Sequence, residues 1–229
     1  MELLRGERDL VRVGHRGAAA LAPENSLAAI EAAAAAGVDA VELDVLPGLV
    51  LGHDLPAEPG AATLDEALAL VARLGLAVQL DVKVPGLGEG IAGALRRHGL
   101  VERSFASSFS PEILAGLARA EPALPLSFTY PEDRLGVSGS RALRPVVRPA
   151  LAAMRAALPR RLPARLRATG ARAATLNWQV VSADVVAACH AIGAAVYVWT
   201  VNDRERARRL LEAGADGIIT DDPRILAPF

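Results

Sequence analysis

The chain has 229 residues, a formal net charge of −1 and 52% hydrophobic residues, a composition that predicts a large buried core. The near-neutral charge provides no overall field for nucleic acid or a membrane surface, so an anionic ligand would have to be held by local groups. The length suits one β/α barrel or two small domains.

The N-terminal segment MELLRGERDL carries charges where a signal peptide requires an apolar run, and no stretch has the roughly 18 uninterrupted apolar residues of a membrane span. We therefore expect a soluble cytoplasmic protein without stable membrane insertion. Cys189 is the only cysteine, which excludes an intramolecular disulfide. Its neighbour His190 leaves a Cys/His site open as an alternative, but a mid-helix position and the lack of a nearby acid favour ordinary packing.

Short β-branched runs alternate with Ala- and Leu-rich stretches along the chain, which indicates parallel strands joined by crossover helices. The predicted strands are residues 11–14, 40–45, 77–82, 104–107, 124–128, 173–176, 195–200 and 216–220. The predicted helices are residues 26–36, 64–74, 87–98, 111–120, 183–192 and 203–213. Several helices begin at a capping residue and end at a glycine. Eight strands favour a closed (β/α)8 TIM barrel, a single domain spanning residues 1–229.

The helix starts are marked by capping residues, namely Ser26, Thr63 with Glu66, Ser110, Ser182, and either Asn202 or Asp203. One segment breaks this regular pattern. Residues 130–170 contain five prolines and many arginines, so we expect interrupted helix there, with an extended rim loop and a helix over RPALAAMRAAL. The arginines could bind phosphate or a lipid headgroup surface, but a solvated face is the expected role.

Acidic residues stand on two neighbouring predicted strands. Glu42 and Asp44 are two residues apart, so both carboxylates project to one face of the strand, and Asp81 with Lys83 repeats the pattern. Three clustered carboxylates repel one another without a cation, so we expect a bound divalent metal, Mg²⁺ or Ca²⁺. Lys83 is the only lysine among the basic residues, which suggests that a compact ammonium group is needed there.

Two histidines lie near the ends of predicted strands, where the active site of a β/α barrel gathers. His15 follows the first strand and His53 follows the second. A histidine gives or takes a proton near neutral pH, so we interpret the two as a catalytic acid and base, with metal ligation as the rival interpretation. Arg16 can grip a phosphate through two parallel hydrogen bonds.

An ordered series of motifs runs along nearly the full chain: HRG at 15–17, PENS at 23–26, ELD at 42–44, HD at 53–54, SSF at 107–109, WTVND at 199–203 and DGIITDDP at 216–223. This series resembles the glycerophosphodiester phosphodiesterase family. The resemblance implies a barrel of the phospholipase C-like phosphodiesterase type that cleaves small-molecule phosphodiesters such as glycerophosphocholine to glycerol 3-phosphate and an alcohol. It also implies that the glycerol 2-hydroxyl attacks phosphorus to give a cyclic phosphate, which water opens.

The resemblance also assigns roles to individual residues. It implies metal ligands at Glu42, Asp44 and Asp81, an acid and base pair at His15 and His53, phosphate contacts from Arg16 and Lys83, a rim braced by Glu24 and Asn25, and a glycerol pocket walled by Trp199. The chain departs from the family pattern in two places: Asp81 stands where LEIK-like sequences carry Glu, and residues 46–52 lack the usual TKDG-like hairpin. Two alternatives stay open, a lysophospholipase D-like enzyme and a non-catalytic barrel that binds a phosphorylated ligand.

Overall fold

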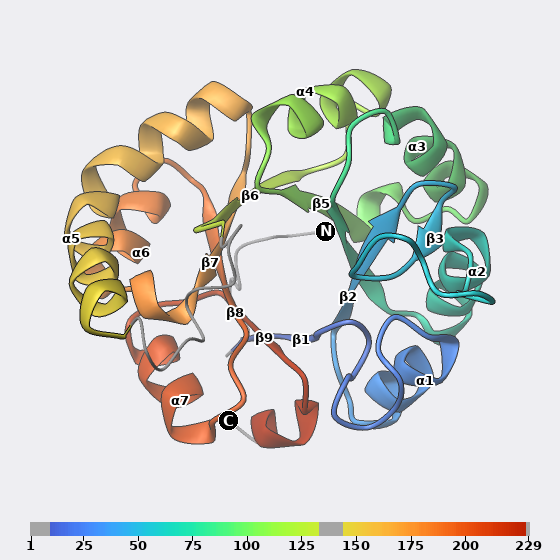
Figure 1. The fold of residues 1–229 in the computed structure, drawn as a ribbon, viewed down its shortest axis with the longest axis horizontal. Coiled ribbons are helices and arrows are strands. Elements are labelled where there is room, and N and C mark those ends of the chain that lie inside the picture. Colours follow the sequence, from blue (N-terminus) through green and yellow to red (C-terminus); the bar gives the residue numbers. More distant parts are fainter. Residues whose placement is uncertain (1–9, 133–143, 228–229) are drawn as a thin grey trace.

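A computed structural model describes residues 10–132 and 144–227 of the chain (Figure 1). Its nine-stranded sheet contains the expected (β/α)8 barrel, because all strands but β3 run parallel and β1 pairs with both β2 and β9 to close the ring. The barrel strands are β1 (Val11–Gly14), β2 (Ala40–Leu46), β4 (Ala77–Val82), β5 (Ser104–Ser108), β6 (Leu126–Tyr130), β7 (Ala173–Asn177), β8 (Ala195–Trp199) and β9 (Gly217–Thr220).

Helices surround this ring in chain order (Figure 1). They are α1 (Leu27–Ala35), α2 (Leu64–Leu74), α3 (Gly88–Arg97), α4 (Pro111–Ala120), α5 (Arg144–Thr169), α6 (Ala183–His190) and α7 (Arg204–Glu212), with short 3₁₀ helices η1 (Val101–Arg103), η3 (Trp178–Val180) and η4 (Pro223–Leu226). The predicted caps are confirmed, including the reciprocal pair of Thr63 and Glu66 at the start of α2. At the start of α7 the cap is Asp203, which leaves Asn202 free for another contact.

Strand β6, the fifth of the barrel, begins two residues later than expected. Residues 124–128 were predicted, whereas β6 spans Leu126–Tyr130. Pro125 has no backbone N–H to give to a strand ladder, and its carbonyl accepts from the backbone N–H of Ala106 at 3.0 Å. The regular strand therefore starts after the proline.

The prediction that residues 46–52 lack a hairpin is wrong. β3 (Val50–Leu51) pairs antiparallel with the end of β2, with Val45 opposite Leu51. The turn uses Gly48 at φ 81° and Leu49 at φ 55°, and Leu49 donates its backbone N–H to the Leu46 carbonyl at 3.1 Å. A different turn sequence thus forms the hairpin that carries the chain to His53.

The prediction that prolines interrupt the helix between residues 130 and 170 is wrong as well. α5 runs from Arg144 to Thr169 with Pro149, Pro159 and Pro163 inside it. Each proline removes one backbone hydrogen bond, but burial of three leucines spaced one turn apart offsets this loss, namely Leu158, Leu162 and Leu166. The rim loop expected next to it overlaps residues 133–143, which lie outside the described residues.

Alternation along the strands divides the interior into two separate cores. Outward-facing residues such as Leu43 and Leu80 pack beneath the helices in the larger cluster. Inward-facing residues fill the lower part of the barrel in a second cluster, made by Val11, Val13, Ala40, Phe105, Ala173, Ala195, Tyr197 and Ile219. This apolar plug closes one end of the barrel, so a cavity can open only at the carboxyl ends of the strands. None of the helices in the described part of the chain is long and apolar enough to cross a membrane.

Candidate active site

One cavity of about 390 Å³ opens at the carboxyl ends of the barrel strands. The structure brings every predicted site residue to its wall, namely His15, Arg16, Glu42, Asp44, His53, Asp81, Lys83 and Trp199. They lie on, or in the loops that follow, five strands: β1, β2, β3, β4 and β8. This arrangement is the one that β/α barrels use for chemistry, whereas the roles of the individual residues stay predictions.

The loop after β1 is folded tightly enough to require two glycines. A Cβ atom on Gly14 would lie 1.8 Å from the Gly17 carbonyl oxygen, and one on Gly17, at φ 87°, would lie 2.6 Å from the Ala29 side chain. Arg16 between them has φ 50°, an unusual backbone conformation for a residue with a side chain. This turn directs the backbone N–H of Arg16 to the Glu42 carboxylate at 2.9 Å.

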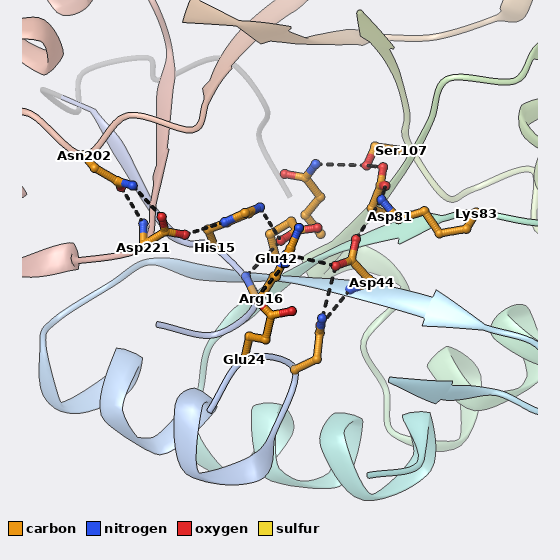
Figure 2. Close-up of polar contacts among 12 residues, drawn as sticks. His15, Arg16, Glu24, Glu42, Asp44, Asp81, Lys83, Ser107, Asn202 and Asp221 are labelled. Carbon is orange, nitrogen blue, oxygen red and sulfur yellow. Dashed lines mark hydrogen bonds and ion pairs between the residues drawn. The ribbon is translucent and has the colours of Figure 1, made fainter. Parts of the chain in front are cut away.

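His15 is held between two carboxylates. Its Nδ1 lies 2.6 Å from Asp221 Oδ1 and its Nε2 lies 3.9 Å from Glu42 Oε2. Asn202 donates to the other oxygen of Asp221, and Figure 2 shows these two residues on one side of His15 with the acidic cluster on the other. Burial opposes protonation of His15, but the hydrogen bond to Asp221 and the charge of Glu42 outweigh it, so the pKa lies above its usual 6.5.

The three acids converge as predicted from their spacing. One oxygen each from Glu42, Asp44 and Asp81 lie within 4.8 Å of one another, and all three residues are buried. Part of their charge is balanced by Lys83, whose Nζ lies 2.6 Å from Asp81 and 2.9 Å from Asp44. A metal is therefore not the only cation that offsets their repulsion, because the lone lysine of the chain bridges two of the acids.

Lys83 forms its ion pairs with Asp44 and Asp81, and Glu42 is the third acid of the cluster. Burial, and then the charge of Asp44, raise the pKa of Glu42 to about 7. At Asp44 burial also raises the pKa, but the charge of Lys83 outweighs this effect, so the pKa of Asp44 lies below its usual value. Three clustered oxygens with one poorly compensated carboxylate are suited to a hard divalent cation.

Residues of the PENS segment hold the acids and Arg16 in place. The side chain of Asn25 donates to Asp44 Oδ2 at 3.1 Å and accepts from the Asp44 backbone N–H at 3.0 Å. Glu24 accepts from the Arg16 guanidinium at 2.7 Å. Arg16 Nε also lies 3.2 Å from Asp44, although the angle does not make this contact a hydrogen bond. The guanidinium is thus fixed at the rim, beside the metal-ligand candidates.

His53 and Trp199 complete the wall. The His53 side chain is 39% exposed and its Nδ1 lies 2.9 Å from the carboxylate of Asp54. Trp199 donates its indole N–H to the Thr175 carbonyl at 3.2 Å and packs edge to face against Phe109, with ring centroids 6.1 Å apart. The two aromatic rings give one side of the cavity an apolar surface.

Several contributors to the site had not been assigned a role from the sequence. Asp221 and Asn202 belong to motifs that the resemblance includes, and their position after the last two strands could have indicated the contact with His15. Gln79 and Ser107, which support Asp81, gave no signal beyond their inward position on β4 and β5. The described side chains of α5 do not line the cavity, and those of its arginines from Arg155 onward are exposed, in agreement with a solvated face.

Comparison with curated proteins gives relatives along nearly the whole chain. A glycerophosphodiester phosphodiesterase of Caldanaerobacter subterraneus is 25% identical over 255 residues, covering 93% of this chain and 95% of the relative. Another of Bacillus altitudinis is 25% identical over 257 residues, covering 91% and 93%. Their names agree with the expected enzyme class, a phosphoric diester hydrolase.

Solved structures of low identity share the fold. A glycerophosphoryl diester phosphodiesterase structure from Silicibacter pomeroyi has a TM-score of 0.72 and 23% identity, covering 94% of this chain and 91% of that one. A phosphodiesterase of Oleispira antarctica in complex with the product sn-glycerol-3-phosphate has a TM-score of 0.71 and 19% identity, covering 93% of each chain. At these identities the likeness concerns the fold, the expected TIM barrel.

The model of the glycerophosphoryl diester phosphodiesterase family matches residues 15–46 and 86–225. The matched ranges include His15, Glu42, Asp44 and Trp199, and the gap between them contains His53, Asp81 and Lys83. The gap begins at the hairpin whose sequence departs from the family pattern. Because the match covers well over half of the chain, the protein belongs to the glycerophosphoryl diester phosphodiesterase family.

Proposed function

We propose that this protein, as one domain over residues 1–229, hydrolyses glycerophosphodiesters to sn-glycerol 3-phosphate and an alcohol, with a divalent metal and the His15/His53 pair. Family membership supports the reaction class. The observation that carries the residue roles is the gathering of both histidines, the three acids, Arg16 and Lys83 around one cavity.

The donor set fits a divalent cation. Glu42, Asp44 and Asp81 offer only oxygen, the ligand type that Mg²⁺ and Ca²⁺ prefer. Glu42, with its pKa of about 7, gains most from a cation nearby. Asp81 is shorter than Glu, but it projects from the strand next to Asp44, directly opposite it in the register. A bound cation would supply charge stabilisation and positioning at the phosphate.

The chemistry of the protein residues begins at the glycerol 2-hydroxyl. One histidine removes its proton as the oxygen attacks phosphorus, the bond from phosphorus to the alcohol oxygen breaks, and the other histidine donates a proton to the leaving alcohol. A water molecule then opens the cyclic phosphate with the proton transfers reversed. The contact of His15 Nδ1 with Asp221 leaves Nε2 directed toward the acids, so this nitrogen is the one that exchanges a proton in the cavity.

Arg16 and Lys83 supply positive charge for the phosphate. Arg16 is anchored through Glu24, which fixes its guanidinium at the rim. Lys83 bridges Asp44 and Asp81. When a cation binds these acids, the ammonium group is free to pair with a phosphate oxygen. The unique lysine thereby has two uses, as counter-ion to the acids and as phosphate ligand.

The test is release of glycerol 3-phosphate from glycerophosphocholine with added Mg²⁺ or Ca²⁺. We expect turnover with a metal, loss of turnover in excess chelator, and loss in His15→Ala and His53→Ala, each of which removes one proton-transfer group. Exposed Arg155→Ala on α5 is the control and retains activity. Full activity in excess chelator would overturn the metal role, and full activity of both histidine variants would overturn the acid and base pair.

A further inference from the structure

We propose that Gln79 is a specificity residue that selects substrates with a free terminal hydroxyl on the glycerol, because its buried side-chain oxygen accepts a hydrogen bond from that hydroxyl. The inference rests on the proposed function and goes beyond it by distinguishing simple glycerophosphodiesters from diesters acylated on glycerol. Its starting point is an unsatisfied polar atom in the wall of the cavity.

Gln79 lies on β4 on the same face of the strand as Asp81 and directly opposite Glu42 on β2. It is 1% exposed yet lines the cavity. Its side chain is therefore part of the cavity floor, level with Glu42, one inward position before Asp81, and next to the apolar plug. A substrate that enters the cavity to its full depth meets this amide.

The hydrogen-bond network determines which end of the amide is left without a partner. Asp81 carries a carboxylate that can only accept, so the Ser107 hydroxyl donates to it, at 2.7 Å. Ser107 must then accept its other hydrogen bond, and Gln79 Nε2 donates it at 2.9 Å. A flipped amide would place two acceptors against each other. The amide nitrogen is committed to Ser107, and the oxygen Oε1 is left for another partner.

Within the part of the chain that the structure describes, no donor contacts Gln79 Oε1, and the hydroxyl oxygen of Thr129 has no hydrogen-bond partner either. Thr129 is also buried and lines the same cavity. Most buried polar atoms in proteins are paired, so an acceptor left open in a cavity wall indicates a donor on the ligand.

The chemistry of the substrate limits what this donor can be. A phosphodiester oxygen only accepts, and a choline headgroup carries no N–H or O–H. In glycerophosphocholine the only donors are the two glycerol hydroxyls, and the 2-hydroxyl is the nucleophile. The terminal hydroxyl remains as the partner of Gln79, with Thr129 able to donate to it in turn. A 1-acyl lysophospholipid has an ester in this place, so it would leave Oε1 buried and unpaired.

The experiment compares glycerophosphocholine with the analogue in which propane-1,2-diol replaces glycerol, so that only the terminal hydroxyl is lost. We expect the unmodified enzyme to favour glycerophosphocholine by about tenfold or more in kcat/KM, since a site built to hydrogen-bond a hydroxyl rejects the analogue without it. Gln79→Met has a side chain of similar length without the acceptor, and we expect it to hydrolyse both compounds at similar rates.

Ser107→Ala is the matched control, because it removes the support of Asp81 but keeps the amide of Gln79. We expect it to lower activity on both compounds by the same factor, so the preference for glycerophosphocholine remains. If Gln79 acted only through Ser107, Gln79→Met would behave in the same way, and that result would overturn the proposal. Equal activity of the unmodified enzyme on both compounds would also overturn it, even if the variant did not fold. Hydrolysis of neither compound would overturn the proposed function instead.

Discussion

The two halves of the barrel interior are built from the same strands and differ in almost every property. In the lower half, the rings of Phe105 and Tyr197 pack at a tilt with centroids 4.9 Å apart and fill the lumen. In the upper half, two strand positions further along, the inward residues are acids, amides and hydroxyls such as Glu42 and Ser107. Burial is nearly complete in both halves, so exposure alone does not separate them.

The halves differ in whether they hold buried polar groups that lack hydrogen-bond or charge partners. The lower half consists of apolar side chains that gain free energy from burial and packing. The upper half holds an acid with its pKa raised to about 7 and, among the described residues, buried polar atoms without partners on Gln79 and Thr129. Such groups stabilise the fold less than apolar ones would. We infer that the lower half stabilises the barrel and that the upper half is arranged for a ligand.

The largest expected effect of a single substitution on rate is in the upper half. His15→Asn should lower kcat for glycerophosphocholine by about 10²- to 10⁴-fold, the usual contribution of a general acid or base. The melting temperature should change little, because Asp221 keeps its hydrogen bond from Asn202. Steady-state kinetics and a thermal melt check both parts. A kcat within a factor of about ten of the original would contradict the role of His15.

A substitution in the lower half should reduce stability and leave kcat nearly unchanged. Phe105→Ala removes a fully buried ring from the plug and should reduce the free energy of unfolding by about 3–5 kcal/mol. The folded fraction should retain most of its kcat. Denaturant unfolding measures the loss, and Phe105→Leu, which leaves a smaller cavity, should lose less. A loss below about 1 kcal/mol would show that the plug is not a main source of stability.

Much of this division could be predicted from the sequence, because side chains two residues apart on a strand point to the same face. The two-residue spacing of Glu42 and Asp44 placed both carboxylates inside the barrel, and the structure brings them within 4.8 Å of Asp81. Capping residues located the helix starts because each cap is a local interaction, as in the pair of Thr63 and Glu66.

Several features that the sequence did not reveal depend on contacts between distant parts of the chain. Prolines in α5 lower helix stability locally, but burial of Leu158 and Leu162 against the barrel outweighs this. Lys83 bridges two acids on adjacent strands, and no local pattern indicates whether a lysine contacts a phosphate or a carboxylate. The open acceptor on Gln79 follows from a hydrogen-bond network between β4 and β5, which only the structure reveals.

Asp221 offers a smaller test of the upper half, through the orientation of His15. Asp221→Asn removes the carboxylate that raises the pKa of His15, so the limb of the pH profile that belongs to His15 should move to lower pH. Loss of its orientation should lower kcat by about 10- to 100-fold.

In the His15→Asn background the same substitution should have almost no further effect, because Asp221 would act through His15 alone. An additive loss in the double variant would mean that Asp221 has a separate role. A pH profile that does not move would show that another group controls this limb.

The smallest expected effect comes from the protonation of Glu42. Its pKa is raised from 4.5 to about 7 by burial and by Asp44, so between these values the metal-free native state holds a proton that the unfolded chain has released. Stability of the metal-free protein should therefore fall as the pH rises through this window, and metal binding should displace the proton. Mg²⁺ affinity, measured by calorimetry, should fall by up to about tenfold for each pH unit below 7. Glu42→Gln cannot bind this proton, so its Mg²⁺ affinity should be weaker and should depend less on pH. An equally steep pH dependence in the variant would show that the proton belongs to another ligand.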